Sequence, residues 1–169
     1  MLKPATLYDQ DLYAWAQAQA ARLREGAWQQ LDLAHLIEEI EDVGHSQRDA
    51  LGSHLLILLT HLLKLVHAAG ALPHEYKRAG PGWRRTCRTQ RRHVAKVLRR
   101  NPSMRPLLPN ELGEAYEIAR LEAAELLEND KAVGTPICPW TAAQVLDDDF
   151  WPEEATPSGP RGEQRHDEP

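Results

Sequence analysis

The basic side chains between Lys77 and Arg100 are the residues of this sequence best suited to binding chemistry. Ten of the chain's twenty lysines and arginines lie in this segment, and no Asp or Glu lies among them. The rest of the chain carries ten basic and twenty-five acidic residues. A segment of opposite sign to the remainder of a protein is suited to binding an acidic protein or the phosphates of a nucleic acid.

Helical phasing divides this segment into two sides. At 100 degrees per residue, one narrow side carries Trp83, Cys87, Gln90, Val94, Val97 and Leu98. The opposite side is broad and basic, and Arg91 lies at the border between the two. The sequence therefore predicts an amphipathic helix over about 83–100, docked through a narrow apolar seam.

Two interpretations of the basic side remain open. In the first, the glutamates of the neighbouring helices pair with it, and each exposed pair contributes about 0 to 1 kcal/mol. In the second, Arg84, Arg85, Arg88 and Arg92 bind a partner, namely an acidic protein or, as the alternative, duplex nucleic acid. Aromatic residues are scarce on this side, which argues against recognition of single strands.

Two histidines form a second candidate site. His54 and His61 are seven residues apart on a predicted helix, so both imidazoles point toward the core or its edge and need partners. A hydrogen bond to a backbone carbonyl, a tyrosine or a carboxylate is one answer. A metal held by Glu39, Glu41 and His61 is the other, and it would make the protein a metal-dependent enzyme. However, the Glu-x-x-His spacing typical of metal sites in helical bundles is absent.

Other catalytic signatures are missing. Cys87 lies on the apolar seam, where packing is its expected role, and no Gly-rich loop precedes a helix as phosphate binding requires. The sequence therefore favours a non-enzymatic interaction or regulatory module, and it predicts no cofactor.

The elements that must position these residues are helices throughout, because apolar residues recur at intervals of three and four. We expect an all-α, single-domain bundle over residues 1–153, with about five main helices and a short C-terminal helix. Gly44 is expected to end or kink the second helix, and the Pro- and Gly-containing segment 73–82 is expected to be a loop. The expected helices span residues 9–25, 32–43, 47–69, 83–100, 110–129 and 141–149.

Particular residues mark the expected ends and inner sides of these helices. Gly26 is expected to end the first helix and Asn110 to cap the fifth. Thr141 with Gln144 is expected to form a capping box at the last helix. The expected inner side of the second helix consists of Leu33, Leu36, Ile37, Ile40 and Val43. The third helix is expected at the centre of the bundle, with an inner face of Leu51, Leu55, Leu58, Leu62 and Leu65.

Composition narrows the class of protein. A chain of 169 residues with 42% apolar and 27% charged residues fits one globular domain. Neither a signal peptide nor a membrane span is expected, and two cysteines form no disulfide framework. These features predict a cytoplasmic protein with no membrane partner and leave its oligomeric state open. Residues 154–169 are Pro-rich and charged, which predicts a disordered tail.

Seven motifs occur in an order that is typical of one family. They are Tyr8–Trp15, Leu36–Glu41 with Gly44, His61–Lys64, Trp83 with Thr86 and Arg91-Arg92, Asn101–Met104, Tyr116 with Ala119-Arg120, and Cys138–Thr141 with Val145–Asp147 and Asp149–Pro152. Over about residues 8–152 the chain resembles the bacterial family called domain of unknown function 29. The segment 65–70 departs from the family's usual polar or aromatic stretch.

The resemblance implies a compact, all-helical cytoplasmic protein of cyanobacteria and proteobacteria, and it carries no established activity. It also implies that the Glu38–Glu41 run and His61 belong to the family pattern, whereas His54 does not. From these positions we hypothesise a polar network of Glu39, Glu41, His61 and Arg91 that joins three helices, in which Arg91 pairs with a carboxylate.

Overall fold

The structure is a computed structural model that describes residues 6–128 and 133–152. The described residues form α-helices and short 3-10 helices and contain no strand, so the predicted all-α class is confirmed. The chain divides into two compact units, Met1–Gln47 and Arg48–Pro169. The predicted tail, residues 154–169, lies outside the described residues, and the domain boundary at residue 153 stays a prediction.

The first unit begins with two short helices, α1 (Leu7–Gln10) and α2 (Leu12–Glu25), in place of the single helix expected from residue 9. Asp11 separates them because its backbone leaves the helical conformation, with φ −156° and ψ 88°, and its side chain caps α2 by accepting the Ala14 N–H. Gly26 ends α2 in the left-handed conformation with φ 70°, a backbone state that glycine adopts without strain. This helix stop was predicted and is confirmed.

Aromatic and polar contacts hold α1 and α2 on the start of the next long helix. Tyr8 stacks on His35 with ring centroids 4.0 Å apart and donates its hydroxyl to Glu39 Oε1 at 2.7 Å. That hydrogen bond to a carboxylate raises the pKa of Tyr8 to about 12. Trp15 Nε1 donates to Asp32 Oδ2, which also receives a hydrogen bond from His35 Nδ1. These contacts hold the helices of the first unit together. The unit also includes the 3-10 helix η1 (Trp28–Gln30).

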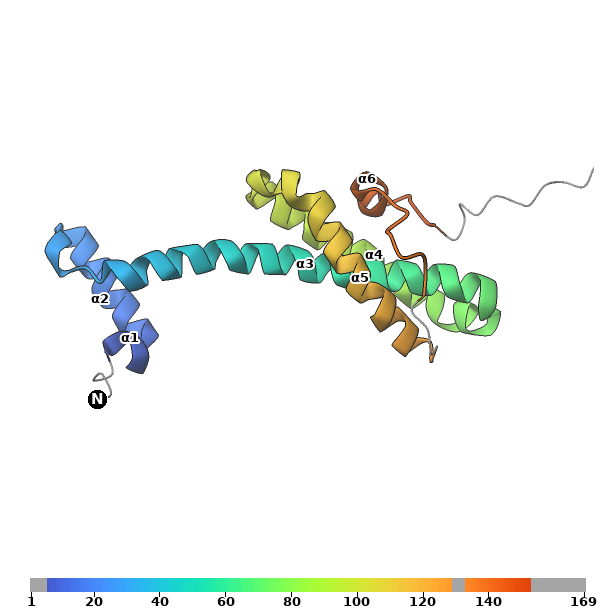
Figure 1. Ribbon diagram of the computed structural model, residues 1–169, viewed down its shortest axis with the longest axis horizontal. Helices are drawn as coiled ribbons and strands as arrows, with labels where there is room; N and C mark the ends of the chain where they lie inside the picture. The colour runs from blue at the N-terminus through green and yellow to red at the C-terminus, as the bar shows by residue number, and fades with distance from the viewer. Residues whose placement is uncertain (1–5, 129–132, 153–169) are drawn as a thin grey trace, which may run out of the picture. The chain divides into compact units, whose positions relative to one another are not determined.

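Helix α3 runs without interruption from Leu33 to Ala71 (Figure 1). The predicted break at Gly44 is therefore wrong. A glycine inside a helix costs only about 0.5–1 kcal/mol relative to alanine, and the polar residues that follow Gly44 continue the helix. Helix α3 is long and apolar enough to cross a membrane, judged by length and composition alone. The core helices of soluble proteins also meet this criterion.

Helix α4 spans Pro73–Arg100, so the expected loop over 73–82 is also wrong. Pro73 occupies the first turn, where the missing N–H has no helical partner to lose. Pro81 lies inside the helix and removes one backbone hydrogen bond, yet the helix continues. Gly80 is buried here, and a Cβ at this position would meet Leu65 at 3.8 Å, so α4 packs closely on α3 at this turn.

The rest of the second unit consists of η2 (Pro102–Leu107), α5 (Leu108–Leu126) and α6 (Ala142–Leu146). Helix α5 begins two residues before the predicted cap, Asn110. The short helix α6 has the predicted capping box, in which the Thr141 side chain accepts the Gln144 N–H and Gln144 accepts the Thr141 N–H. That prediction is confirmed.

The core of the second unit lies on the C-terminal half of α3. The five leucines predicted for its inner face, Leu51, Leu55, Leu58, Leu62 and Leu65, are fully buried. Helix α4 runs back along this half of α3, and α5 crosses it (Figure 1). Tyr116 and Ala119 of α5 complete the core. The prediction that residues 47–69 form the central helix is therefore confirmed for this unit.

Candidate functional site

The apolar seam of α4 fixes which of its basic side chains face outward. Trp83, Cys87, Val94 and Leu98 are buried in the core, as the phasing predicted. Gln90 on the same seam is half-buried and accepts a hydrogen bond at 2.8 Å from His54 Nδ1. The seam therefore docks α4 along one side and leaves the broad basic side exposed.

Arg91, the border residue, is buried at 3% exposure. Its guanidinium donates to three carbonyl oxygens of the C-terminal segment: Nε to Val145 at 2.9 Å, Nη1 to Asp148 at 3.2 Å and Nη2 to Phe150 at 2.7 Å. Burial lowers the pKa of Arg91, but a guanidinium stays protonated in proteins. Arg91 is therefore a buried cation that holds the chain after α6 against α4.

Arg91 thus binds backbone carbonyls where the sequence predicts a carboxylate, and the network of Glu39, Glu41, His61 and Arg91 stays a prediction. Glu39 bonds to Tyr8 in the first unit, and His61 Nδ1 donates to the Ile57 carbonyl of its own helix at 2.8 Å. Glu39 and Glu41 lie in the first unit, and His61 and Arg91 lie in the second.

Trp151 lies in the middle of an arginine cluster that the sequence analysis did not predict. The guanidinium carbons of Arg84, Arg88 and Arg91 lie 4.7, 5.2 and 4.8 Å from the centre of its ring. Each cation over an indole face contributes about 0.5–1 kcal/mol where exposed and about 2 kcal/mol where desolvated. The ring is 8% exposed, so Trp151 anchors the chain after α6 on α4.

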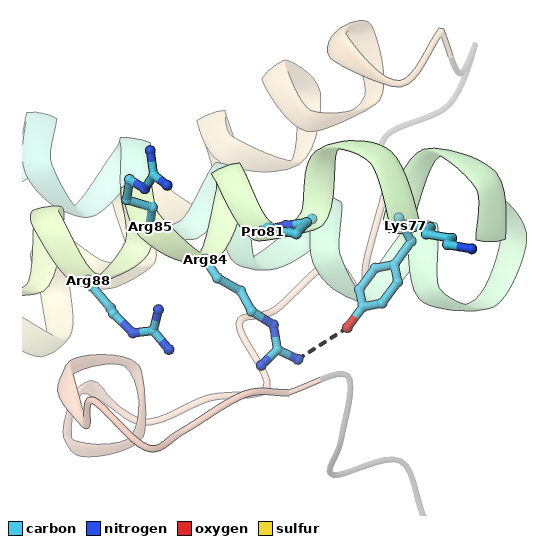
Figure 2. Close-up of a pocket in the computed structure, with 7 residues that line it drawn as sticks. Lys77, Pro81, Arg84, Arg85 and Arg88 are labelled. Atoms are coloured by element: carbon cyan, nitrogen blue, oxygen red, sulfur yellow. Dashed lines mark hydrogen bonds between the residues drawn. The ribbon is translucent and has the colours of Figure 1, made fainter.

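A depression of about 460 Å³ lies beside this cluster on α4, lined by Tyr76, Pro81, Arg84, Arg85 and Arg88 among others. Figure 2 shows Arg84 and Arg88 pointing toward the C-terminal segment and Arg85 pointing to the other side of the helix. Its dashed line is the hydrogen bond of 3.1 Å from Arg84 Nη2 to the Tyr76 hydroxyl. Two of the four arginines predicted to bind a partner, Arg84 and Arg88, thus make contacts within the protein.

Five basic residues of α4 lie in a line along the helix, which we call the cationic stripe; Arg88 belongs to this line and also contacts Trp151. The stripe consists of Arg85, Arg88, Arg92, Lys96 and Arg99, all exposed. These positions recur every three or four residues and span about 21 Å at 1.5 Å per residue. Arg92, the fourth predicted residue, donates to Thr89 Oγ1 at 3.2 Å and remains exposed.

No carboxylate of the described residues lies within ion-pair distance of the cationic stripe. The ion pair found on α4 is Arg78 with Glu75, at 2.8 Å and outside the stripe. Glu111 of α5 pairs with Arg48 of α3 at 2.6 Å. The interpretation in which neighbouring glutamates neutralise the basic side therefore has no support within the described part of the chain.

The histidines have partners within the protein. His54 bonds to Gln90 and lies near His93, with ring centroids 4.8 Å apart. His61 bonds to a backbone carbonyl, and partial burial lowers its pKa. Across residues 6–128 and 133–152, no group of three or more His, Cys, Asp or Glu is placed to hold a metal ion. The described residues therefore form no metal centre around His61.

Sequence reasoning missed Trp151 and Tyr76 as parts of the arginine cluster. Tyr76 lies in the segment 73–82, where the sequence predicts a loop. Trp151 lies outside the predicted helices, so helical phasing does not indicate which way its side chain points. A signal was present, because a tryptophan beside Phe150 in a charged, Pro-rich end of the chain needs an apolar or cationic surface to cover it.

Comparison with known proteins identifies a family for this chain. The model of the family described as Domain of unknown function DUF29 matches residues 7–151. No curated protein and no solved structure matches the chain.

Proposed function

The chain belongs to the family described as Domain of unknown function DUF29, and from this premise we propose that it is a helical interaction module. Its cationic stripe binds an acidic segment of a partner protein. The observation that carries the proposal is the stripe itself: five exposed basic side chains in one line, with no ion-pair partner among the described residues.

The geometry of α4 favours a partner with regularly spaced carboxylates. The seam and the buried Arg91 hold α4 rigidly on the core, so the stripe keeps its spacing before a partner arrives. A helix with Glu or Asp at intervals of three and four would present its carboxylates at the same spacing. Each such exposed pair is weak, and affinity therefore depends on several pairs forming together.

The overall charge favours a protein over duplex nucleic acid. The whole chain has a net charge of −5, which repels a polyanion at a distance and slows its approach. A short acidic peptide segment meets less of this repulsion because it carries fewer charges.

The test measures binding of a dye-labelled helical peptide with Glu at positions i, i+4, i+7, i+11 and i+14, by fluorescence anisotropy. The double charge reversal Arg85→Glu and Arg92→Glu is expected to weaken binding by about tenfold or more. These two positions are chosen because Arg84 and Arg88 also contact Trp151, so their replacement would disturb the fold.

The matched control is the double reversal Arg24→Glu and Arg105→Glu, which changes the net charge equally at two exposed arginines outside α4. This control variant should bind the acidic peptide with an affinity within about twofold of the wild-type value. Both double variants should keep the wild-type melting temperature. Equal loss in both variants would refute a specific surface. Tighter binding of a DNA duplex, with a log-log salt slope near −0.9 per phosphate, would favour the nucleic-acid alternative instead.

A further inference from the structure

The first unit contains an apolar groove that none of its described residues, 6–47, fills. The groove has a volume of about 670 Å³ and lies between α2 and the start of α3. One wall is the α2 row Leu12, Ala16, Ala20 and Leu23, and the other includes Ile40 and Val43 of α3. All of these residues belong to the unit Met1–Gln47.

The shape of the walls suits a third helix. The α2 row repeats at intervals of four, four and three residues, so it forms a straight ridge on the helix. Its two central members are alanines, whose small side chains let another helix approach closely. The two apolar walls therefore resemble two sides of a helical bundle from which one helix is missing.

The apolar side chains at the groove are unusually exposed. Ile40 is 70% exposed and Val43 is 66% exposed. By helical phasing, the sequence predicts these residues on the inner side of a helix. Single exposed apolar residues are common, but a contiguous apolar surface on a soluble protein marks an interaction site.

Charge identifies the kind of helix that fits. Residues 1–47 contain eight acidic and three basic residues, whereas residues 48–169 contain seventeen of each. Glu39 lines the groove, and Glu41 lies on the other side of the apolar stripe of α3 by helical phasing. From this combination we propose that the groove binds a basic amphipathic helix of a partner protein, with apolar residues facing the groove and Lys or Arg beside the carboxylates.

A second copy of the chain fits the groove less well. Two copies joined through this face would bring together two units that each carry a net charge of −5, and like charges oppose such pairing. The proposal is also separate from the function proposed for α4, because that surface is basic and its partner is acidic.

The test uses isothermal titration calorimetry of the full chain with a helical peptide of roughly 18 residues, about five turns. The peptide has Leu at positions i, i+3, i+4 and i+7 and Lys elsewhere. We expect this peptide to bind, and Ile40→Lys to weaken it by about tenfold or more. The matched control is Ile118→Lys, which replaces an exposed isoleucine of α5 (51% exposed) and should leave the affinity unchanged.

A second peptide with Glu in place of every Lys separates this proposal from the one for α4. The acidic peptide should bind without sensitivity to Ile40→Lys, or fail to bind. The proposal is overturned if the Leu and Lys peptide does not bind, if both isoleucine variants weaken it equally, or if the acidic peptide shows the same Ile40 dependence. Sedimentation of the chain as a dimer that Ile40→Lys dissociates would also overturn it, since the occupant would then be a second copy.

Discussion

His61 gives the clearest pH-dependent behaviour of a single residue. Its imidazole is partly buried and its Nδ1 donates to the Ile57 carbonyl at 2.8 Å. Burial lowers its pKa below the ordinary 6.5, and nearby Lys64 lowers it further. Below pH 6.5 the unfolded chain therefore binds more protons than the folded one, so stability falls as the pH falls through this window.

We expect the substitution His61→Gln to reduce this acid-dependent loss. Thermal unfolding of the wild type and the variant between about pH 7.5 and pH 5 checks this expectation. The range includes the pKa of a free imidazole, about 6.5. The wild-type melting temperature should fall more over this range than that of the variant. Parallel curves would show that His61 titrates normally in the folded state.

Arg91 is the residue whose replacement should cost the most stability among the basic residues of α4. Arg91→Lys keeps the charge but replaces a planar fork with a single ammonium, so the carbonyls of Val145, Asp148 and Phe150 cannot all keep a donor. We expect a loss of about 2–5 kcal/mol of unfolding free energy, measured by urea denaturation.

The neighbouring Arg92→Lys is the matched control for this prediction. Arg92 is exposed and bonds to Thr89 three residues away in its own helix. It should change stability by no more than about 0.5 kcal/mol. Equal effects at positions 91 and 92 would contradict the structural role assigned to the buried guanidinium.

These residues also show what the sequence could predict about the site. The position of Arg91 at the border of the apolar seam follows from helical phasing, because the helical period determines on which side of the helix each residue lies. Its partners do not follow, since Val145 and Phe150 lie 54 and 59 residues further along the chain. No local pattern identifies contacts at that separation, and a carboxylate was therefore expected where carbonyls are found.

At the scale of the element, Gly44 shows that a glycine inside α3 does not interrupt the helix. A Cβ at Gly44 would meet no atom within 4 Å, and the residue lies inside a continuous helix. We therefore expect Gly44→Ala to stabilise the protein by roughly 0.5–1 kcal/mol, measured by chemical denaturation. A destabilising effect would instead support a chain reversal with a left-handed glycine at this position.

The helix boundaries show why turn-forming residues misled the prediction. Gly26 ends a helix and Gly44 does not, although both follow an amphipathic run. Gly80-Pro81-Gly82 resembles a turn, yet it lies within α4. In both failed cases the continuing helix buries side chains further along, at Leu51 in α3 and Trp83 in α4. Tertiary burial of this kind outweighs local propensity.

At the scale of the whole molecule, buried residues are distributed unequally between the two units. Among the described residues of the first unit, Trp15 and Gln19 are buried, and every other buried residue follows position 50. Local opening has a low free energy where few side chains are buried. Backbone amides of α2 should therefore exchange hydrogen much faster than those of residues 51–65 in α3.

Hydrogen exchange followed by mass spectrometry or NMR checks this expectation in the intact chain. Binding of a helix in the groove between α2 and α3 should then slow exchange in α2, because it would add the missing burial. Uniform protection across both units in the free protein would contradict the unequal distribution of the core.

The arginine cluster around Trp151 also bears on the order in which the chain folds. Arg91 and Phe150 are 59 residues apart in sequence, so their contact closes a long loop whose entropy cost is recovered only after α4 and α5 have formed. We therefore expect the segment after α6 to attach to α4 late in folding. Weakening its interactions should then speed unfolding and leave the rate of folding nearly unchanged.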